Sequence, residues 1–179
     1  MSRHSRAIRH CRPVYGCALV VLLAIVVLLP THILAAVRVG QPAPNFKVTT
    51  TSGQPVSLDN YRGYVLAIDF FTTWCPPCKQ SIPHLVEMNR KYGKQGFQIL
   101  GQSMDEDGER AVKEFIQEYH INYPVALAPQ QIQNDYGIVS VPVMYVIDKN
   151  GKVAEVYRGF SDEIRFSMEN LVKKLLAEK

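Results

Sequence analysis

The chain has 179 residues, and its 20 lysines and arginines exceed its 16 aspartates and glutamates to give a formal net charge of +4. The whole excess lies in residues 1–36, which hold four arginines and no acidic residue. A remainder without net charge gives no reason to expect nucleic acid or an anionic membrane surface as a partner. About 140 residues are enough to bury a full core without structural disulfides, so a single domain is expected.

The first predicted element is an export segment. Its arginines precede an apolar stretch at 14–29 and a short run that ends at Ala36. A basic end before an apolar core is typical of a signal peptide, or of a membrane anchor whose positive end stays in the cytoplasm. Ala36 suits a cleavage site but Leu34 does not, whereas 17–37 is long enough to cross a bilayer. We expect 1–36 to be a signal or, in preference, an anchor, which places the remaining residues outside the cytoplasm, in the periplasm or on the outer face of the membrane.

Strand and helix patterns alternate along residues 46–179, after a short linker at 37–45. The expected strands are 46–50, 55–58, 64–71, 97–104, 123–127, 143–147 and 152–157. The expected helices are 76–92, 109–120, a helical turn at 130–136, and 162–177. Asn150-Gly151 predicts a two-residue turn in the last hairpin. This order predicts an α/β fold, in which a mixed sheet is flanked by helices on both faces and begins with an N-terminal β-hairpin.

Two cysteines mark the candidate site. Residues 74–78 read Trp-Cys-Pro-Pro-Cys and follow the apolar run 65–71, so both thiols lie where a buried strand turns into a helix. The free N–H groups and the dipole at a helix start favour an anion, and the thiolate is the reactive form of cysteine. The two prolines suit the first helical turn. We expect Cys75 to be exposed and acidic, and Cys78, one turn further on, to be buried.

A structural metal or a structural disulfide explains this pair less well. Structural zinc usually takes four protein ligands, and the other cysteines, Cys11 and Cys17, lie in the leader. A Cys-x-x-Cys loop is too short to remove much chain entropy, and its disulfide is easily reduced. The sequence therefore predicts a redox-active Cys75–Cys78 disulfide, with no metal and no other cofactor.

The chain resembles a known family at these residues. Residues 69–79 look like the active-site stretch of thioredoxin-fold proteins, and 41–179 is similar to the TlpA/ResA group of membrane-linked thiol-disulfide reductases. Segment 40–46 resembles one that this group shares with the peroxiredoxins of the redoxin or AhpC/TSA type. The motifs that carry the similarity are the Trp-Cys-Pro-Pro-Cys core, Asp69, Pro83 and Val141-Pro142. The resemblance implies a thioredoxin-like sheet with a central inserted helix–strand element.

Asp69 stands in the apolar strand 64–71, where burial of a carboxylate raises its pKa or suits it to proton transfer. The resemblance places Asp69 where thioredoxin has a buried aspartate that serves the resolving thiol. Many TlpA/ResA-like proteins have asparagine there, so this chain departs toward thioredoxin. The alternative is that Asp69 faces a polar edge and caps another group.

Val141-Pro142 opens the strand 143–147, because proline cannot donate to a sheet ladder. The resemblance implies that this peptide bond is cis and packs against the disulfide, which leaves the Val141 backbone free to pair with an extended substrate. An ordinary trans proline is the alternative. The predicted substrate-binding residues are Trp74, Pro76, Pro77, Val141 and Pro142.

Other polar residues have simpler interpretations. His84 and His120 are isolated histidines on predicted helices, where a surface position is expected, since no second ligand stands at metal-binding spacing. The acidic run 105–107 is interpreted as a solvated helix start that the helix dipole favours.

The predicted function is that of an exported, membrane-tethered enzyme that mainly reduces protein disulfides. In this hypothesis Cys75 attacks the substrate, and Cys78, with its proton taken through Asp69, resolves the mixed disulfide. An oxidising compartment cannot re-reduce the pair, so a membrane thiol electron donor is implied. The resemblance implies apocytochrome c as one substrate, and hence a role in cytochrome c maturation.

Three alternatives use the same residues. A peroxiredoxin-type peroxidase would share Thr72, but Ile68 stands where its proline is expected, and Cys78 is too close to be its usual resolving thiol. A disulfide oxidase would use the pair with the opposite redox poise. A copper-carrying module would bind metal through both cysteines and a distal histidine.

Overall fold

The computed structural model describes residues 37–106 and 108–178. The predicted signal or anchor segment at 1–36, with Cys11 and Cys17, lies outside the described residues, as does Asp107. Among the residues described, no helix is both long enough and apolar enough to cross a membrane.

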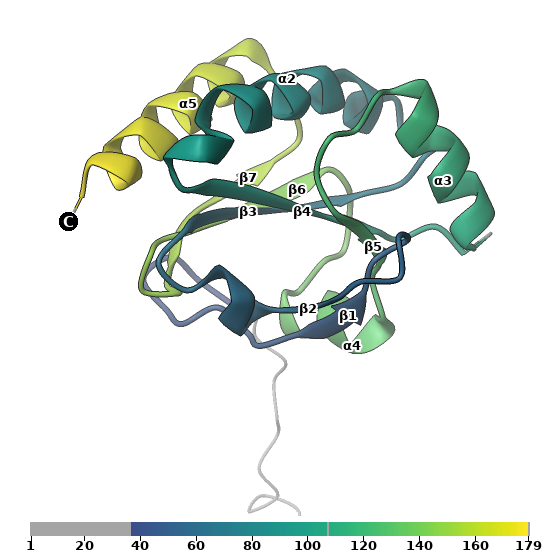
Figure 1. The fold of residues 1–179 in the computed structure, drawn as a ribbon, viewed down its shortest axis with the longest axis horizontal. Coiled ribbons are helices and arrows are strands. Elements are labelled where there is room, and N and C mark those ends of the chain that lie inside the picture. Colours follow the sequence, from purple (N-terminus) through teal and green to yellow (C-terminus); the bar gives the residue numbers. More distant parts are fainter. Residues whose placement is uncertain (1–36, 107, 179) are drawn as a thin grey trace, which may run out of the picture. The chain divides into compact units, whose positions relative to one another are not determined.

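A five-stranded mixed sheet forms the centre of the fold (Figure 1). Its strands, in spatial order, are β5 (Val125–Leu127), β4 (Phe97–Ser103), β3 (Val65–Phe71), β6 (Val143–Ile147) and β7 (Val153–Arg158). β3, β4 and β5 are parallel, whereas β6 and β7 are antiparallel to their neighbours. A separate antiparallel pair joins β1 (Lys47–Thr49) and β2 (Pro55–Ser57). The predicted mixed sheet and N-terminal hairpin are therefore confirmed.

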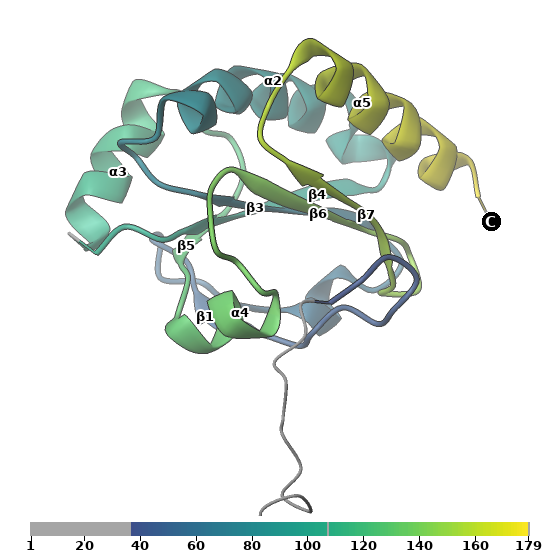
Figure 2. The same ribbon diagram turned by 180° about the vertical axis from the view of Figure 1, so that it is seen from behind.

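Helices and the hairpin cover the two faces of the sheet (Figures 1 and 2). The helices α2 (Pro76–Tyr92), α3 (Glu109–Glu118) and α5 (Asp162–Ala177) lie on one face. The other face is covered by β1, β2, the 3-10 turn η1 (Leu58–Tyr61) and the short helix α4 (Gln130–Asp135). A second 3-10 turn, η2 (Gly93–Gln95), ends α2. The α3–β5 unit is the inserted helix–strand element that the resemblance implied.

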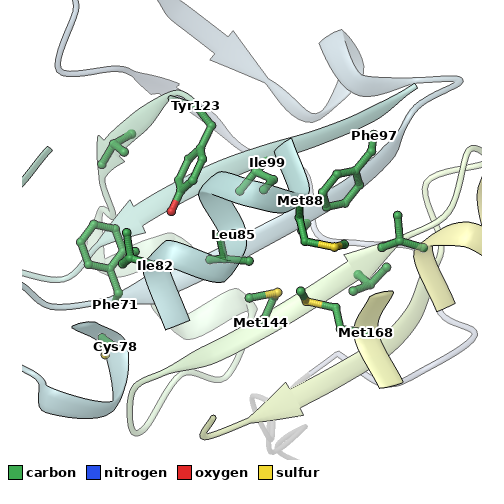
Figure 3. Packing of buried hydrophobic residues seen from close by; sticks show 14 of the residues in the cluster. Phe71, Cys78, Ile82, Leu85, Met88, Phe97, Ile99, Tyr123, Met144 and Met168 are labelled. Atoms are coloured by element: carbon green, nitrogen blue, oxygen red, sulfur yellow. The ribbon is translucent and has the colours of Figure 1, made fainter. Parts of the chain in front are cut away.

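β3 is the most deeply buried strand, with all seven residues buried. A strand that is covered on both faces reads as a continuous apolar run, which is why 65–71 is almost entirely apolar. Its alternate residues face two separate cores: Val65, Ala67 and Phe71 pack under α2, α3 and α5, whereas Leu66, Ile68 and Phe70 pack on the hairpin side. Figure 3 shows the first core, where Ile82, Leu85 and Met88 of α2 lie over the sheet.

The β6–β7 connection differs from the two-residue turn predicted from Asn150-Gly151. Gly151 N donates to Asp148 O at 2.9 Å, and Asp148 N donates to Lys152 O at 2.8 Å. Lys149 and Asn150 are therefore the central turn residues, and Gly151, with φ +79°, takes the left-handed position that follows them. Asp148 Oδ1 selects this geometry by accepting hydrogen bonds from the backbone N–H groups of Asn150 and Lys152.

Residues 40–43 run beside the start of β7. Gly40 N donates to Val153 O at 2.7 Å, and Val153 N donates to Gln41 O at 2.9 Å. Ala43 N donates to Gly151 O at 2.9 Å. These bonds cover part of an edge strand whose backbone groups would otherwise be open to pairing.

Candidate active site

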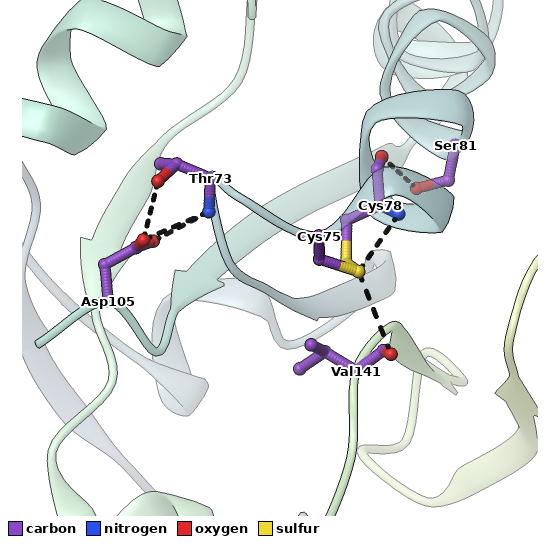
Figure 4. Close-up of a disulfide and its surroundings, with 6 residues drawn as sticks. All are labelled: Thr73, Cys75, Cys78, Ser81, Asp105 and Val141. Atoms are coloured by element: carbon purple, nitrogen blue, oxygen red, sulfur yellow. Dashed lines mark hydrogen bonds between the residues drawn. A yellow bond between two sulfur atoms is a disulfide. The ribbon is translucent and has the colours of Figure 1, made fainter.

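Cys75 and Cys78 form a disulfide at the start of α2, with their Cα atoms 5.3 Å apart (Figure 4). Cys75 is the N-cap residue, and its Sγ accepts a hydrogen bond from Cys78 N at 3.4 Å. Pro76 and Pro77 occupy the first two helical positions and have no N–H, so the first N–H of the helix is the one directed at this sulfur. That N–H and the helix dipole stabilise a thiolate at Cys75 once the pair is reduced.

The two cysteines differ in accessibility. Cys78 is 0% exposed and Cys75 is 5% exposed. Burial of Cys78 confirms the prediction, whereas the expectation of an exposed Cys75 is wrong for the disulfide form. The reason is that Cys75 lies at the floor of a groove rather than on an open surface.

This groove, called the substrate groove below, has a volume of about 430 Å³ and no charged lining residue. It is lined by Thr72, Trp74, Cys75, Pro76, Met104, Ile138, Val139, Ser140 and Val141. Trp74 is 68% exposed and Val139 is 90% exposed, so apolar surface flanks the disulfide. Of the predicted substrate-binding residues, Trp74, Pro76 and Val141 therefore line the same groove as Cys75.

The two remaining predicted residues lie elsewhere. Pro77 is exposed on the first turn of α2 but does not line the substrate groove, and Pro142 is buried. The Val141–Pro142 peptide bond is cis, as the resemblance implied. Val141 O lies 3.9 Å from Cys75 Sγ, and the β3–β6 ladder begins only at Val143. Val141 is therefore beside the disulfide and outside the ladder.

Asp69 is fully buried on β3, between Gly101 of β4 and Met144 of β6. Among the groups that the structure describes, neither carboxylate oxygen has a hydrogen-bond partner. Burial raises the pKa of Asp69 from 3.8 to about 7, because the charged form loses its hydration. The predicted buried carboxyl with a raised pKa is confirmed, and the alternative of a cap at a polar edge is wrong. A group with a pKa near 7 can accept and release protons at neutral pH.

A small cavity of about 10 Å³ adjoins Asp69 on the side of α5. It is lined by Asp69, Ser81, Pro142, Met144, Tyr157, Gly159, Phe160, Ile164, Arg165 and Met168. A space of this size holds about one water molecule. Ser81 Oγ donates to Cys78 O at 2.9 Å, so one cavity wall belongs to the turn of α2 that carries the second cysteine. A proton on Asp69 thus has a polar neighbour space beneath the pair.

Asp105, at the end of β4, holds the loop before Cys75 (Figure 4). Thr73 N donates to both carboxylate oxygens at 3.1 and 3.0 Å, and Thr73 Oγ1 donates to Oδ1 at 2.6 Å. Ser103 Oγ donates to Oδ2 at 2.7 Å. Asp105 is only 8% exposed, so its interpretation as a solvated helix start is wrong, and α3 begins later, at Glu109. The available signal was its place after a parallel strand, since such strand ends meet at one sheet edge.

His84 is also placed differently from the prediction. It is 8% exposed, and its ring lies 6.3 Å from the ring of Phe160. Burial, followed by the nearby charge of Arg165, lowers the pKa of His84. His120 is exposed at the end of α3, as expected. Within 37–106 and 108–178, no three His, Cys, Asp or Glu side chains are grouped so that they could hold a metal ion.

The fold and the reducible pair together place the chain among the thiol-disulfide oxidoreductases of thioredoxin-like fold. Within that class, the chain belongs to the AhpC/TSA family, whose model matches residues 39–156.

Several relatives are similar over most of the chain. The thiol-disulfide oxidoreductase ResA of Bacillus thuringiensis subsp. konkukian (strain 97-27) is 33% identical over 140 residues, which are 78% of this chain and 79% of that protein. The thioredoxin-like protein YneN of Bacillus subtilis (strain 168) is 29% identical over 124 residues, covering 69% and 73%. A crystal structure of a thiol:disulfide interchange protein of the thioredoxin family from Chlorobium tepidum TLS superposes with a TM-score of 0.70 and 31% identity, covering 80% of this chain and 100% of that one.

Proposed function

We propose that this protein is an exported, membrane-tethered thiol-disulfide oxidoreductase that acts mainly as a reductase of protein disulfides. The observation that carries the proposal is the environment of the pair. Cys75 Sγ receives a helix N-terminal hydrogen bond at the floor of an uncharged groove, and a carboxyl with a pKa of about 7 is buried nearby on β3. The groove offers access for a substrate, the helix start activates the nucleophile, and the buried acid can take a proton.

In the first step, the Cys75 thiolate attacks one sulfur of a substrate disulfide. The substrate S–S bond breaks, a Cys75–substrate bond forms, and the other substrate sulfur leaves as a thiolate. Cys78 then gives its proton to the Asp69 carboxylate and attacks Cys75 Sγ. The Cys75–Cys78 bond forms and the second substrate sulfur leaves, so two electrons have passed to the substrate. Asp69 then releases its proton to solvent.

The substrate groove suits an extended segment of a protein substrate. Trp74, Pro76 and Val141 supply an apolar, uncharged lining, so a cysteine flanked by apolar residues is favoured. The Val141 backbone, outside the β3–β6 ladder and beside Cys75, is available for pairing with an added strand. Pro77 and the cis Pro142 complete the substrate-binding group by shaping the first turn of α2 and the loop before β6.

The partners and the compartment follow from the redox direction. We propose that the oxidised pair is re-reduced by a membrane thiol electron donor and that the disulfide is the only redox group. The basic, then apolar residues 1–36 support export and a tether. Similarity to ResA supports a place outside the cytoplasm, with apocytochrome c as one substrate and hence a role in cytochrome c maturation. A reporter fused after Lys179 should be active outside the cytoplasm, and activity only inside would contradict this placement.

A trapping experiment tests the reaction. The Cys78→Ser variant keeps Cys75 but cannot resolve, so reduced variant mixed with a disulfide-bonded protein should accumulate a covalent adduct that dithiothreitol releases. Cys75→Ser is the matched control and should form no adduct. Failure of Cys78→Ser to form an adduct, together with peroxide consumption by the unaltered protein, would instead support the peroxidase.

A further inference from the structure

Two buried polar side chains on the helix side of the sheet lack partners: Asp69 and Tyr123. Tyr123 is 7% exposed, and its hydroxyl is buried with no hydrogen-bond partner among the residues described. A buried hydroxyl that makes no hydrogen bond costs about 1–3 kcal/mol. This cost is unusual for a group without a task, so the surroundings of Tyr123 are informative.

Gly101 brings Tyr123 close to Asp69. Gly101 is the β4 residue paired with Asp69, and a Cβ atom built on it would lie 3.5 Å from Tyr123 Cε2 and 3.2 Å from Phe71 Cε1. The Tyr123 ring therefore occupies the space that a side chain at position 101 would take. Figure 3 shows this ring reaching into the core, with its hydroxyl directed inward toward Phe71 and Ile82. Neighbouring strands lie about 4.8 Å apart, so the hydroxyl is directed into the neighbourhood of Asp69.

The charges around Asp69 agree with this arrangement. Burial, and secondly the negative charge of Asp69, raise the pKa of Tyr123, so the hydroxyl keeps its proton and can only serve as a donor to a carboxylate. Tyr157 of β7 and Arg165 of α5 line the cavity on the other side of Asp69. Tyr157 Oη lies 3.2 Å from Ser167 Oγ, and Arg165 Nε lies 3.3 Å from Asp162 Oδ1, so both are engaged elsewhere.

The cysteine pair is the remaining group that faces Asp69, from the side of α2. In this structure it is oxidised and has no proton to exchange. Among the titratable groups that the structure describes around Asp69, Tyr123 is thus the one with an uncommitted hydrogen-bond donor.

We propose that Tyr123 is a positioning residue for the proton transfer: when Asp69 ionises, the Tyr123 hydroxyl donates a hydrogen bond to its carboxylate, directly or through one water. The inference rests on the proposed function, in which Asp69 accepts the proton of Cys78. Tyr123 keeps its own proton throughout. The bond favours the charged form of Asp69, so a larger fraction of the enzyme holds an ionised acceptor at neutral pH.

The test is Tyr123→Phe, which removes one oxygen and leaves the ring over Gly101. We expect the pH midpoint for resolution of a Cys75 mixed disulfide to rise by about one unit, and the rate at pH 7 to fall about tenfold, with recovery at high pH. The carboxyl ¹³C titration of Asp69 should shift upward by the same amount. A merely structural tyrosine would move neither readout.

The controls separate this inference from the proposed function. Tyr92→Phe removes another hydroxyl of the same core, bonded to Glu169 at 2.6 Å, and should leave the pH profile unchanged. Combining Tyr123→Phe with Asp69→Asn should give the rate of Asp69→Asn alone. An unchanged profile and titration in Tyr123→Phe, when Asp69→Asn slows resolution, would overturn the inference alone. An unchanged rate in Asp69→Asn would overturn both it and the proposed proton acceptor.

Discussion

Replacing Asp69 with asparagine isolates the cost of burying an ionised carboxylate under the active site. The side chain is fully buried, and burial raises its pKa from 3.8 to about 7. A shift of one pKa unit corresponds to about 1.4 kcal/mol, so the ionised form lowers the free energy of unfolding by about 4 kcal/mol relative to the neutral form. Asparagine has nearly the same shape and carries no charge at any pH.

The sign of the pH dependence follows from proton binding. Below pH 3.8 Asp69 is protonated in both states, and the stability it contributes as a neutral group is fully present. Between pH 3.8 and about 7 the unfolded chain has lost this proton while the folded chain retains it, so the free energy of unfolding falls as pH rises. Above about 7 both states are ionised and the loss is complete. The stability of Asp69→Asn relative to the unaltered protein should therefore increase from pH 4 to pH 8 by about 4 kcal/mol.

Denaturant unfolding of the oxidised proteins at several pH values measures this difference. Other carboxylates titrate alike in both proteins and cancel from it. Asp59→Asn is the control, since that side chain is 66% exposed and its replacement should add no such pH dependence. In the same variant, single-turnover resolution of a mixed disulfide should slow near neutral pH. Unchanged turnover with lower stability at every pH would mean that Asp69 is a structural group and not the proton acceptor.

Two further predictions concern the loop and the nucleophile. Asp105→Ala removes the carboxylate that holds Thr73 N and Oγ1, so we expect a loss of roughly 2–4 kcal/mol in the free energy of unfolding and slower disulfide exchange, and unaltered melts and rates would argue against this anchoring role. Alkylation of the reduced protein below pH 7, followed by mass spectrometry, should label Cys75 much faster than Cys78, because Cys75 Sγ receives the helix N–H and borders the substrate groove; preferential labelling of Cys78 would reverse the proposed roles.

Local patterns were sufficient to predict most of the fold. The predicted helices 76–92 and 162–177 coincide with α2 and α5, because a cap residue begins each of them and apolar residues recur on one face. The buried run at 65–71 identified the central strand, and with it the burial of Asp69. The cis bond before Pro142 came from family resemblance, since spacing alone favours the trans form.

The rest depends on contacts between segments that are distant in the sequence. Asp105 was misassigned because its partner, Thr73, lies 32 positions away on the neighbouring strand end. His84 is buried because α5 and the Phe160 loop cover α2, which a single helix pattern does not reveal. Tyr123 acquires its interest only through the pairing of Gly101 with Asp69. In each case the deciding partner belongs to another element.

The reduction potential of the Cys75/Cys78 couple tests the central claim most directly. It is measured by equilibrating the purified protein with glutathione or dithiothreitol buffers and quantifying the two redox forms. The proposed reductase should have a potential near that of thioredoxin, about −270 mV. A value near −120 mV, which is typical of strong disulfide oxidants, would contradict the reductase and reverse the direction of electron flow.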